Sequence, residues 1–384
     1  MRTWMPSSGM YSVRFESLDA LRGLAALAVV VHHVTDIHIG GPAVIVFFVI
    51  SGYCIAAAGA SARRNNLGFG KFMHRRVRRI FPPYLLSLAL WAAYRLAKWK
   101  ATGVNELDRS WLEWFQNATL TQWVTLLRHP GDYPPANPTL FVGAYWSLCY
   151  EEQFYLVMGL LAGFGLSALV SRWMVFALLV AGLVWNAFFP SVVFGIFIEY
   201  WAPFAIGCMV YYRLCELPLC SSAVGTRGPR ARGAIDILLL AILGGSIVLF
   251  VRSGGVPPLN ASGGEVRSIP QDLTVASAVA VLLVLARPFD SRIAAAWLFK
   301  PLRGLGQVTF SLYLTHQFNL GIAQRVAALV VGPQRAGTLA GWLISIVFLV
   351  CVGAVFWWFC ERPFLNKPLA QPAPGSGKTP ESSR

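Results

Sequence analysis

Ten apolar segments, all candidates for membrane-spanning helices although the second, fifth and eighth are short, constrain this chain more than any other feature. Spanning a hydrocarbon core of about 30 Å takes about 17–25 apolar residues in a helix. Only 13% of the residues are charged, whereas a soluble domain carries about 25%. The sequence therefore predicts an all-α fold, a polytopic membrane helix bundle of about ten transmembrane helices. The predicted spans are about 18–38, 43–59, 80–97, 144–166, 172–189, 193–212, 234–251, 271–286, 305–331 and 337–359.

The basic residues predict the orientation of these spans. If the N-terminus is cytoplasmic and the spans alternate, most of the 32 Lys and Arg residues fall in cytoplasmic connectors, as the positive-inside rule requires. Both termini are then cytoplasmic. The net charge of +15 is explained by this bias rather than by one basic patch, so we expect contact with membrane lipid and no nucleic-acid partner. The first apolar stretch lacks a small-x-small cleavage site and is predicted to be a retained membrane helix.

The chain divides into three predicted parts. Residues 1–17 form a cytoplasmic N-terminal segment, and 18–365 form the membrane domain. Residues 366–384 form a cytoplasmic tail, which is rich in Pro, Ser and Gly and is expected to be disordered. With no second soluble domain in the sequence, the membrane bundle must itself be the functional unit. Seven cysteines with no CxxC and no Cys/His cluster predict neither a disulfide nor a metal site.

Polar groups inside the first span are candidates for function, because a charge at the centre of a membrane helix costs about 2.5–3.5 kcal/mol. Arg22 and His33 are eleven residues apart in the sequence. Both therefore project from the same helical face, roughly 16 Å apart along the axis. Asp19 precedes Arg22 by one turn and could pair with it.

A carboxylate of the fourth span is predicted to meet this histidine. With the predicted orientation, His33 and Glu151 both lie roughly 8 Å below the outer surface. A histidine oriented by a carboxylate is a general base that can remove a proton from a hydroxyl. Glu152 points about 100° away from Glu151, so one of the two is expected to face His33. The alternative is that His33 only makes a hydrogen bond between helices.

Two further histidines are assigned structural roles. His32 lies on a different helical face from His33. His316 lies near mid-depth of the ninth span and could line the same cavity, although a structural role is favoured.

A basic run beside the third span offers a second candidate site. Arg76 and Arg79 share one helical face, as do Arg75 and Arg78. Guanidinium groups placed in this way suit bidentate phosphate recognition. The alternative is plain contact with lipid headgroups. No serine-nucleophile motif, glycine-rich phosphate loop or HExxH motif is present in the sequence.

Six motifs, in order from about residue 15 to 365, resemble those of the membrane acyltransferase 3 family. Arg22 and His33 occupy the positions of its basic residue and histidine separated by ten residues. Arg76 and Arg79 match its RxxR. Cys149-Tyr150 stands where Ser-Val is usual, and the chain ends without the hydrolase-like domain that some members carry. The motifs are LDALRGLAALAVVVHH, FFVISGY, RRVRRIFPPY, YWSLCYEEQFYL, GQVTFSLYLTH and ERPF.

The resemblance implies a multi-pass enzyme of the bacterial inner membrane. It would take an acyl group from cytoplasmic acyl-CoA, with acetyl-CoA favoured, and pass it to a hydroxyl of an extracytoplasmic carbohydrate or glycolipid, such as lipopolysaccharide O-antigen or exopolysaccharide. His33 becomes the base, with Glu151 or Glu152 orienting it. Arg22 is counted with these three among the catalytic residues, and Arg76, Arg79 and Arg22 become contacts for the CoA donor. The alternative is a proton-coupled transporter or flippase of sugars or lipid-linked glycans, which predicts internal inverted repeats that we do not find.

Overall fold

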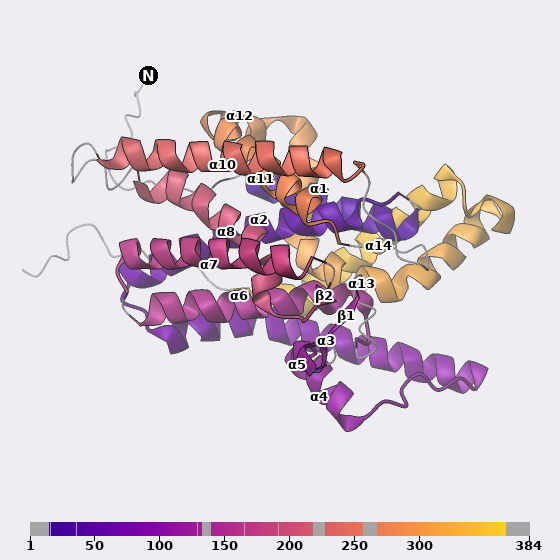
Figure 1. Cartoon of the computed structure of the whole chain (residues 1–384). Helices are drawn as coiled ribbons and strands as arrows, with labels where there is room; N and C mark the ends of the chain where they lie inside the picture. The colour runs from indigo at the N-terminus through magenta and orange to yellow at the C-terminus, as the bar shows by residue number, and fades with distance from the viewer. Residues whose placement is uncertain are drawn as a thin grey trace, which may run out of the picture.

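The computed structural model describes residues 15, 17–35, 37–128, 130–132, 140–164, 166–190, 192–217, 227–255 and 267–365. Most of these residues lie in helices that run side by side (Figure 1). The longer helices are α1 (Ser17–Val34), α2 (Gly40–Arg64), α3 (Phe69–Thr102), α6 (Trp146–Gly163), α7 (Ala168–Phe188), α8 (Trp201–Tyr211), α10 (Arg227–Arg252), α11 (Ile269–Ala286), α13 (Lys300–Val331) and α14 (Leu339–Phe356). The short elements are α4 (Trp111–Thr119), α5 (Trp123–Arg128), α12 (Asp290–Ala295), strands β1 (Gly131–Asp132) and β2 (Val192–Val193), and the single turns η1 (Gly143–Tyr145), η2 (Phe197–Tyr200), η3 (Tyr212–Glu216), η4 (Arg287–Phe289), η5 (Trp297–Phe299), η6 (Pro333–Arg335), η7 (Trp357–Glu361) and η8 (Arg362–Phe364).

Each predicted span overlaps one of the longer helices, and the predicted helical fold is confirmed. Within the described residues, six helices are long and apolar enough to cross a membrane: α1, α2, α7, α10, α11 and α14. The chain is therefore a multi-pass membrane protein. The number of ten spans and the cytoplasmic side of both termini remain predictions. The proposed tail at 366–384 lies outside the described residues.

The sixth predicted span, 193–212, is only partly helical. Its first residues form β2, which pairs antiparallel with β1, and the turn η2; the helix α8 begins at Trp201. Gly195 has a φ of +77°, a conformation that ends regular structure and that glycine adopts at little cost. The buried Glu199 carboxylate accepts hydrogen bonds from the Phe194 amide and the Tyr150 hydroxyl. With these contacts the backbone before Trp201 forms a strand and a 3-10 turn, where apolar composition predicted an α-helix.

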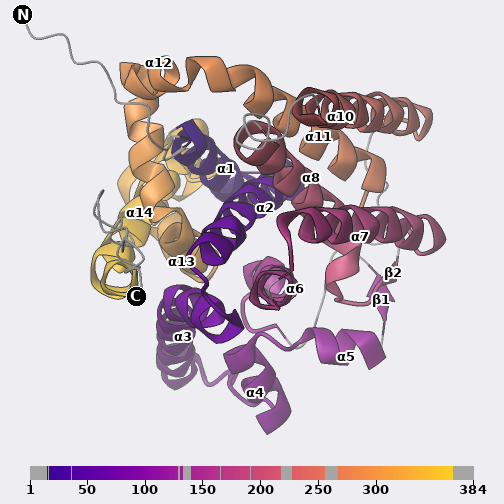
Figure 2. The same ribbon diagram turned by 90° about the vertical axis from the view of Figure 1, so that its left-hand side faces the viewer.

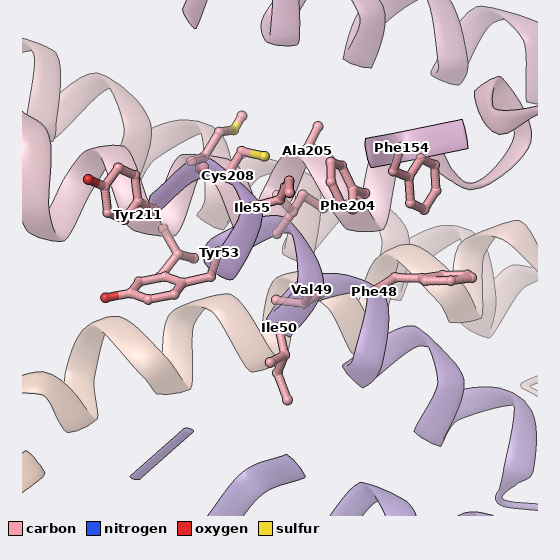
Figure 3. Packing of buried hydrophobic residues seen from close by; sticks show 14 of the residues in the cluster. Phe48, Val49, Ile50, Tyr53, Ile55, Phe154, Phe204, Ala205, Cys208 and Tyr211 are labelled. Atoms are coloured by element: carbon pink, nitrogen blue, oxygen red, sulfur yellow. The ribbon is translucent and has the colours of Figure 1, made fainter. Parts of the chain in front are cut away.

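The core lies where α2 meets α8. A Cβ at Gly52 would lie 2.9 Å from the Phe204 carbonyl carbon, and one at Gly207 would lie 2.8 Å from that of Val49. The two glycines thus let the backbones approach closely, as small residues do in membrane bundles. Buried aromatic side chains fill the space around this contact, including the stacked rings of Phe154 and Phe204 (Figure 3).

A second close contact joins α1 to α13. A Cβ at Gly306 would lie 2.7 Å from the Asp19 carbonyl carbon, and one at Gly23 would lie 3.0 Å from that of Leu302. Seen along the bundle, α13 lies beside α1, while α2 lies between α1 and α6 (Figure 2). This order of helices decides which polar side chains can meet.

Candidate active site

A cavity of about 580 Å³ lies among α1, α2, α3, α6, α13 and η7. We call it the arginine cavity, because three guanidinium groups line it together with three carboxyl groups. These charged side chains are Asp19, Arg22, Arg76, Arg79, Glu151 and Glu361. Such a concentration of charge is costly inside a membrane bundle and marks a functional site. Its volume is in the usual range for small-molecule sites, about 300–1,000 Å³.

Arg22 lines the arginine cavity from α1, whereas His33, which was predicted on the same helical face, does not. Its guanidinium pairs with Asp19 one turn earlier, at 3.8 Å, which confirms the predicted pairing. The same guanidinium donates to the Cys54 sulfur of α2 at 3.5 Å. Arg22 is thus held between two helices and keeps part of its surface open to the cavity.

Arg76 and Arg79 line the same cavity from α3, as their shared face predicted. The Arg76 guanidinium lies over the rings of Phe72 and Tyr155, at 5.7 and 5.5 Å from their centroids. In the part of the chain that the structure describes, neither guanidinium has a carboxylate within ion-pair distance. Their donors are therefore available to an anion that enters the cavity.

The Glu151 carboxylate has partners other than the one predicted. It accepts hydrogen bonds from the Ser51 hydroxyl of α2 and from the Tyr155 hydroxyl one turn along α6. Among the described residues, no hydrogen bond or ion pair joins His33 to Glu151. The structure therefore does not bring the predicted base and its orienting carboxylate together, because α2 separates α6 from α1.

Glu152 also lies away from His33. Its side chain faces a much narrower pocket between α3 and α6, of about 20 Å³, whose other lining residues include Val77 and Phe81. Glu151 lines this narrow pocket as well, but of the two glutamates only Glu151 also lines the arginine cavity.

His33 is not among the residues that line the arginine cavity. Its ring centroid is 4.9 Å from that of His32 and 5.0 Å from that of His316. The His316 ring lies 5.8 Å from Tyr313, which lines the cavity. The side chain that approaches His33 from another helix is thus a second imidazole, from α13.

His32 has a position that fits the predicted structural role. Its Nδ1 lies 3.1 Å from the Ile37 carbonyl oxygen, and its ring packs so closely on Gly40 that a Cβ there would meet it.

Comparison with known proteins identifies the chain. The family model described as "Acyltransferase domain" matches residues 15–358. The chain belongs to the acyltransferase 3 family.

Relatives of this acyltransferase carry consistent names. A protein named as a membrane-bound transacylase, BcsY of Komagataeibacter xylinus, is 28% identical over 351 residues, which cover 88% of this chain and 81% of that protein. A protein named as a peptidoglycan O-acetyltransferase, YrhL of Bacillus subtilis, is 24% identical over 90% of this chain and 54% of its own length. The O-acetyltransferase OatA of Staphylococcus aureus is 27% identical over 46% of this chain and 29% of its own length. No solved structure matches the chain. Together the family and its relatives make this chain a membrane O-acyltransferase.

Several residues of this acyltransferase's site escaped the sequence reasoning. Glu361 of η7 lines the cavity and accepts hydrogen bonds from the backbone N–H and the hydroxyl of Ser311. Tyr313 donates to the Ala144 carbonyl and shares a hydrogen bond with Ser147. These residues lie in the motifs GQVTFSLYLTH and ERPF, so the motifs themselves were the signal. Single-helix periodicity could not show that the two motifs meet.

Proposed function

We propose that this acyltransferase takes an acyl group, acetyl in the first instance, from cytoplasmic acyl-CoA and transfers it to a hydroxyl of an extracytoplasmic carbohydrate or glycolipid, such as lipopolysaccharide O-antigen or exopolysaccharide, across the bacterial inner membrane. The observation that carries the proposal is the arginine cavity, in which the guanidinium groups of Arg76 and Arg79 make no ion pair with a carboxylate of the described residues. A CoA carries phosphate groups at one end and a thioester at the other. The names of the relatives YrhL and OatA favour acetyl transfer.

The chemistry assigned to the site is a direct acyl transfer. His33 accepts the proton of the acceptor hydroxyl while the hydroxyl oxygen bonds to the thioester carbonyl carbon. The carbon–sulfur bond then breaks, and the CoA thiolate leaves and takes up the proton from the His33 imidazolium. Arg76 and Arg79 bind the CoA phosphates, and Arg22 lies in the same cavity, between α1 and α2.

The donor site is tested with a double substitution, Arg76→Ala with Arg79→Ala, in membrane vesicles that contain the full chain. Each lost charge-assisted hydrogen bond is worth about 1.5–3 kcal/mol, so we expect the KM for acetyl-CoA to rise at least about tenfold. The matched control is Lys71→Ala with Arg78→Ala, which removes the same charge from exposed positions of the same helix. An equal KM in both double variants would return Arg76 and Arg79 to lipid contact.

The acceptor is tested separately. Mass spectrometry of surface glycans from cells with and without the gene should show loss of an O-acyl mass from one glycan class. Unchanged glycans, with acetyl-CoA consumption retained in vesicles, would refute a carbohydrate acceptor without affecting the donor site.

A further inference from the structure

We infer that His316 of α13, and not a carboxylate, is the positioning residue that orients His33. The inference rests on the proposed function, because it supplies the partner that the proposed general base lacks. It is carried by the geometry of two imidazole rings from different helices.

The backbone of α13 fixes the protonation of His316. Its side chain is only 1% exposed, and its Nδ1 lies 2.8 Å from the Tyr313 carbonyl oxygen and 3.2 Å from that of Leu312. A carbonyl oxygen can only accept a hydrogen bond, so Nδ1 must carry the proton. In the neutral ring, Nε2 is then an acceptor with a free lone pair.

That acceptor has no partner. The Nε2 atom of His316 is buried and makes no hydrogen bond within the described part of the chain. Leaving a buried polar atom unpaired costs about 1–3 kcal/mol, and such an atom in a native fold calls for an explanation. A hydrogen-bond donor that reached this nitrogen would remove that cost.

The ring of His33 lies beside that of His316. The two centroids are 5.0 Å apart and the ring planes differ by 39°. His33 likewise makes no hydrogen bond to any described residue. A small rotation of the rings would let one N–H of His33 donate to Nε2 of His316, and catalytic hydrogen bonds often tighten only when substrate binds.

This hydrogen bond would prepare His33 as a base. One nitrogen of His33 donates its proton to His316, so the other must carry the lone pair that accepts the hydroxyl proton. The proton stays on His33, and His316 remains neutral while it accepts a hydrogen bond from the imidazolium. A neutral partner avoids placing a permanent charge at this depth of the membrane, and Glu151 is already bonded to Ser51 and Tyr155.

Three substitutions at His316 separate the possible roles. His316→Phe keeps the ring volume but no nitrogen. His316→Asn can still donate to the Tyr313 carbonyl, and His316→Gln can place an acceptor near the position of Nε2. We expect Phe and Asn to lower kcat for acetyl transfer on the order of 10²-fold, whereas Gln keeps a substantial part of the activity. The KM for acetyl-CoA should not change. His32→Gln is the matched control and should retain wild-type kcat.

A double-mutant cycle tests whether His316 acts through His33. In a His33→Ala background, adding His316→Phe should cost nothing further, because the base it orients is already gone. Full activity of His316→Phe, a multiplicative loss in the double variant, or failure of all three variants to accumulate in the membrane would each overturn the inference. A wild-type protein that consumes no acetyl-CoA would instead refute the proposed function.

Discussion

The close contact between α1 and α13 positions Arg22 and His33 relative to His316. A single methyl group added at this contact should therefore lower both stability and activity. In Gly306→Ala, the new Cβ would lie 2.7 Å from the Asp19 carbonyl carbon and 3.1 Å from its Cα. Favourable carbon–carbon contact begins at about 3.5 Å. The two helices must therefore separate by roughly 1 Å, because the atoms in the way belong to the backbone of α1.

Two consequences of that separation can be measured. Overpacking of this kind costs about 1–3 kcal/mol, so the midpoint of thermal unfolding in detergent should fall. Arg22 and His33 on α1 also move relative to His316 on α13, and a misplacement of about 1 Å can lower a rate about 10²-fold. We expect both effects in Gly306→Ala, with the activity loss exceeding the loss of folded protein.

Gly304→Ala and Gly321→Ala are the matched controls. Both lie on α13, and a Cβ at either would meet no atom within 4 Å. Alanine is the better helix former by about 1 kcal/mol, so these variants should be as stable as the wild type or more stable. Wild-type stability and activity in Gly306→Ala would refute the claim that the α1–α13 contact positions the site.

Two further predictions concern other parts of the bundle. Cys54 lines the arginine cavity beside Arg22, so alkylation of its thiol should block acyl transfer. Acetyl-CoA should protect the wild type against alkylation, and the Cys54→Ser variant should resist it. Equal inhibition of Cys54→Ser would place the sensitive thiol elsewhere. The guanidinium of the buried Arg267 lies 3.9 Å from the centroid of the Tyr200 ring and pairs with Asp272 at 3.1 Å. Arg267→Met should therefore destabilise the fold by about 3–5 kcal/mol. A melting temperature equal to that of the exposed-site control Arg252→Met would contradict this.

The helical architecture could be predicted because it depends on local properties of the chain. The length of the apolar segments was enough to predict a helix that overlaps each span. The i, i+3 spacing predicted that Arg76 and Arg79 share a helical face, and both line the arginine cavity. The limit of prediction from apolar composition is seen in residues 193–212, for which it predicted a helix from the first residue. The α-helix there begins only at Trp201, after the left-handed Gly195 and the hydrogen bonds to Glu199. An apolar pattern encodes neither feature.

The partner of His33 could not be predicted because it depends on the order of helices around the bundle. Depth and periodicity describe each helix by itself, and Glu151 was chosen because its predicted depth matched that of His33. Which helix lies beside α1 is decided by close backbone contact, and Gly23 and Gly306 allow that contact with α13. From the sequence alone, a glycine in an apolar span can be interpreted either as a helix breaker or as a site of close helix packing. The sequence reasoning did not predict that Gly23 and Gly306 pack α13 against α1. This packing brings His316, rather than a glutamate, to His33.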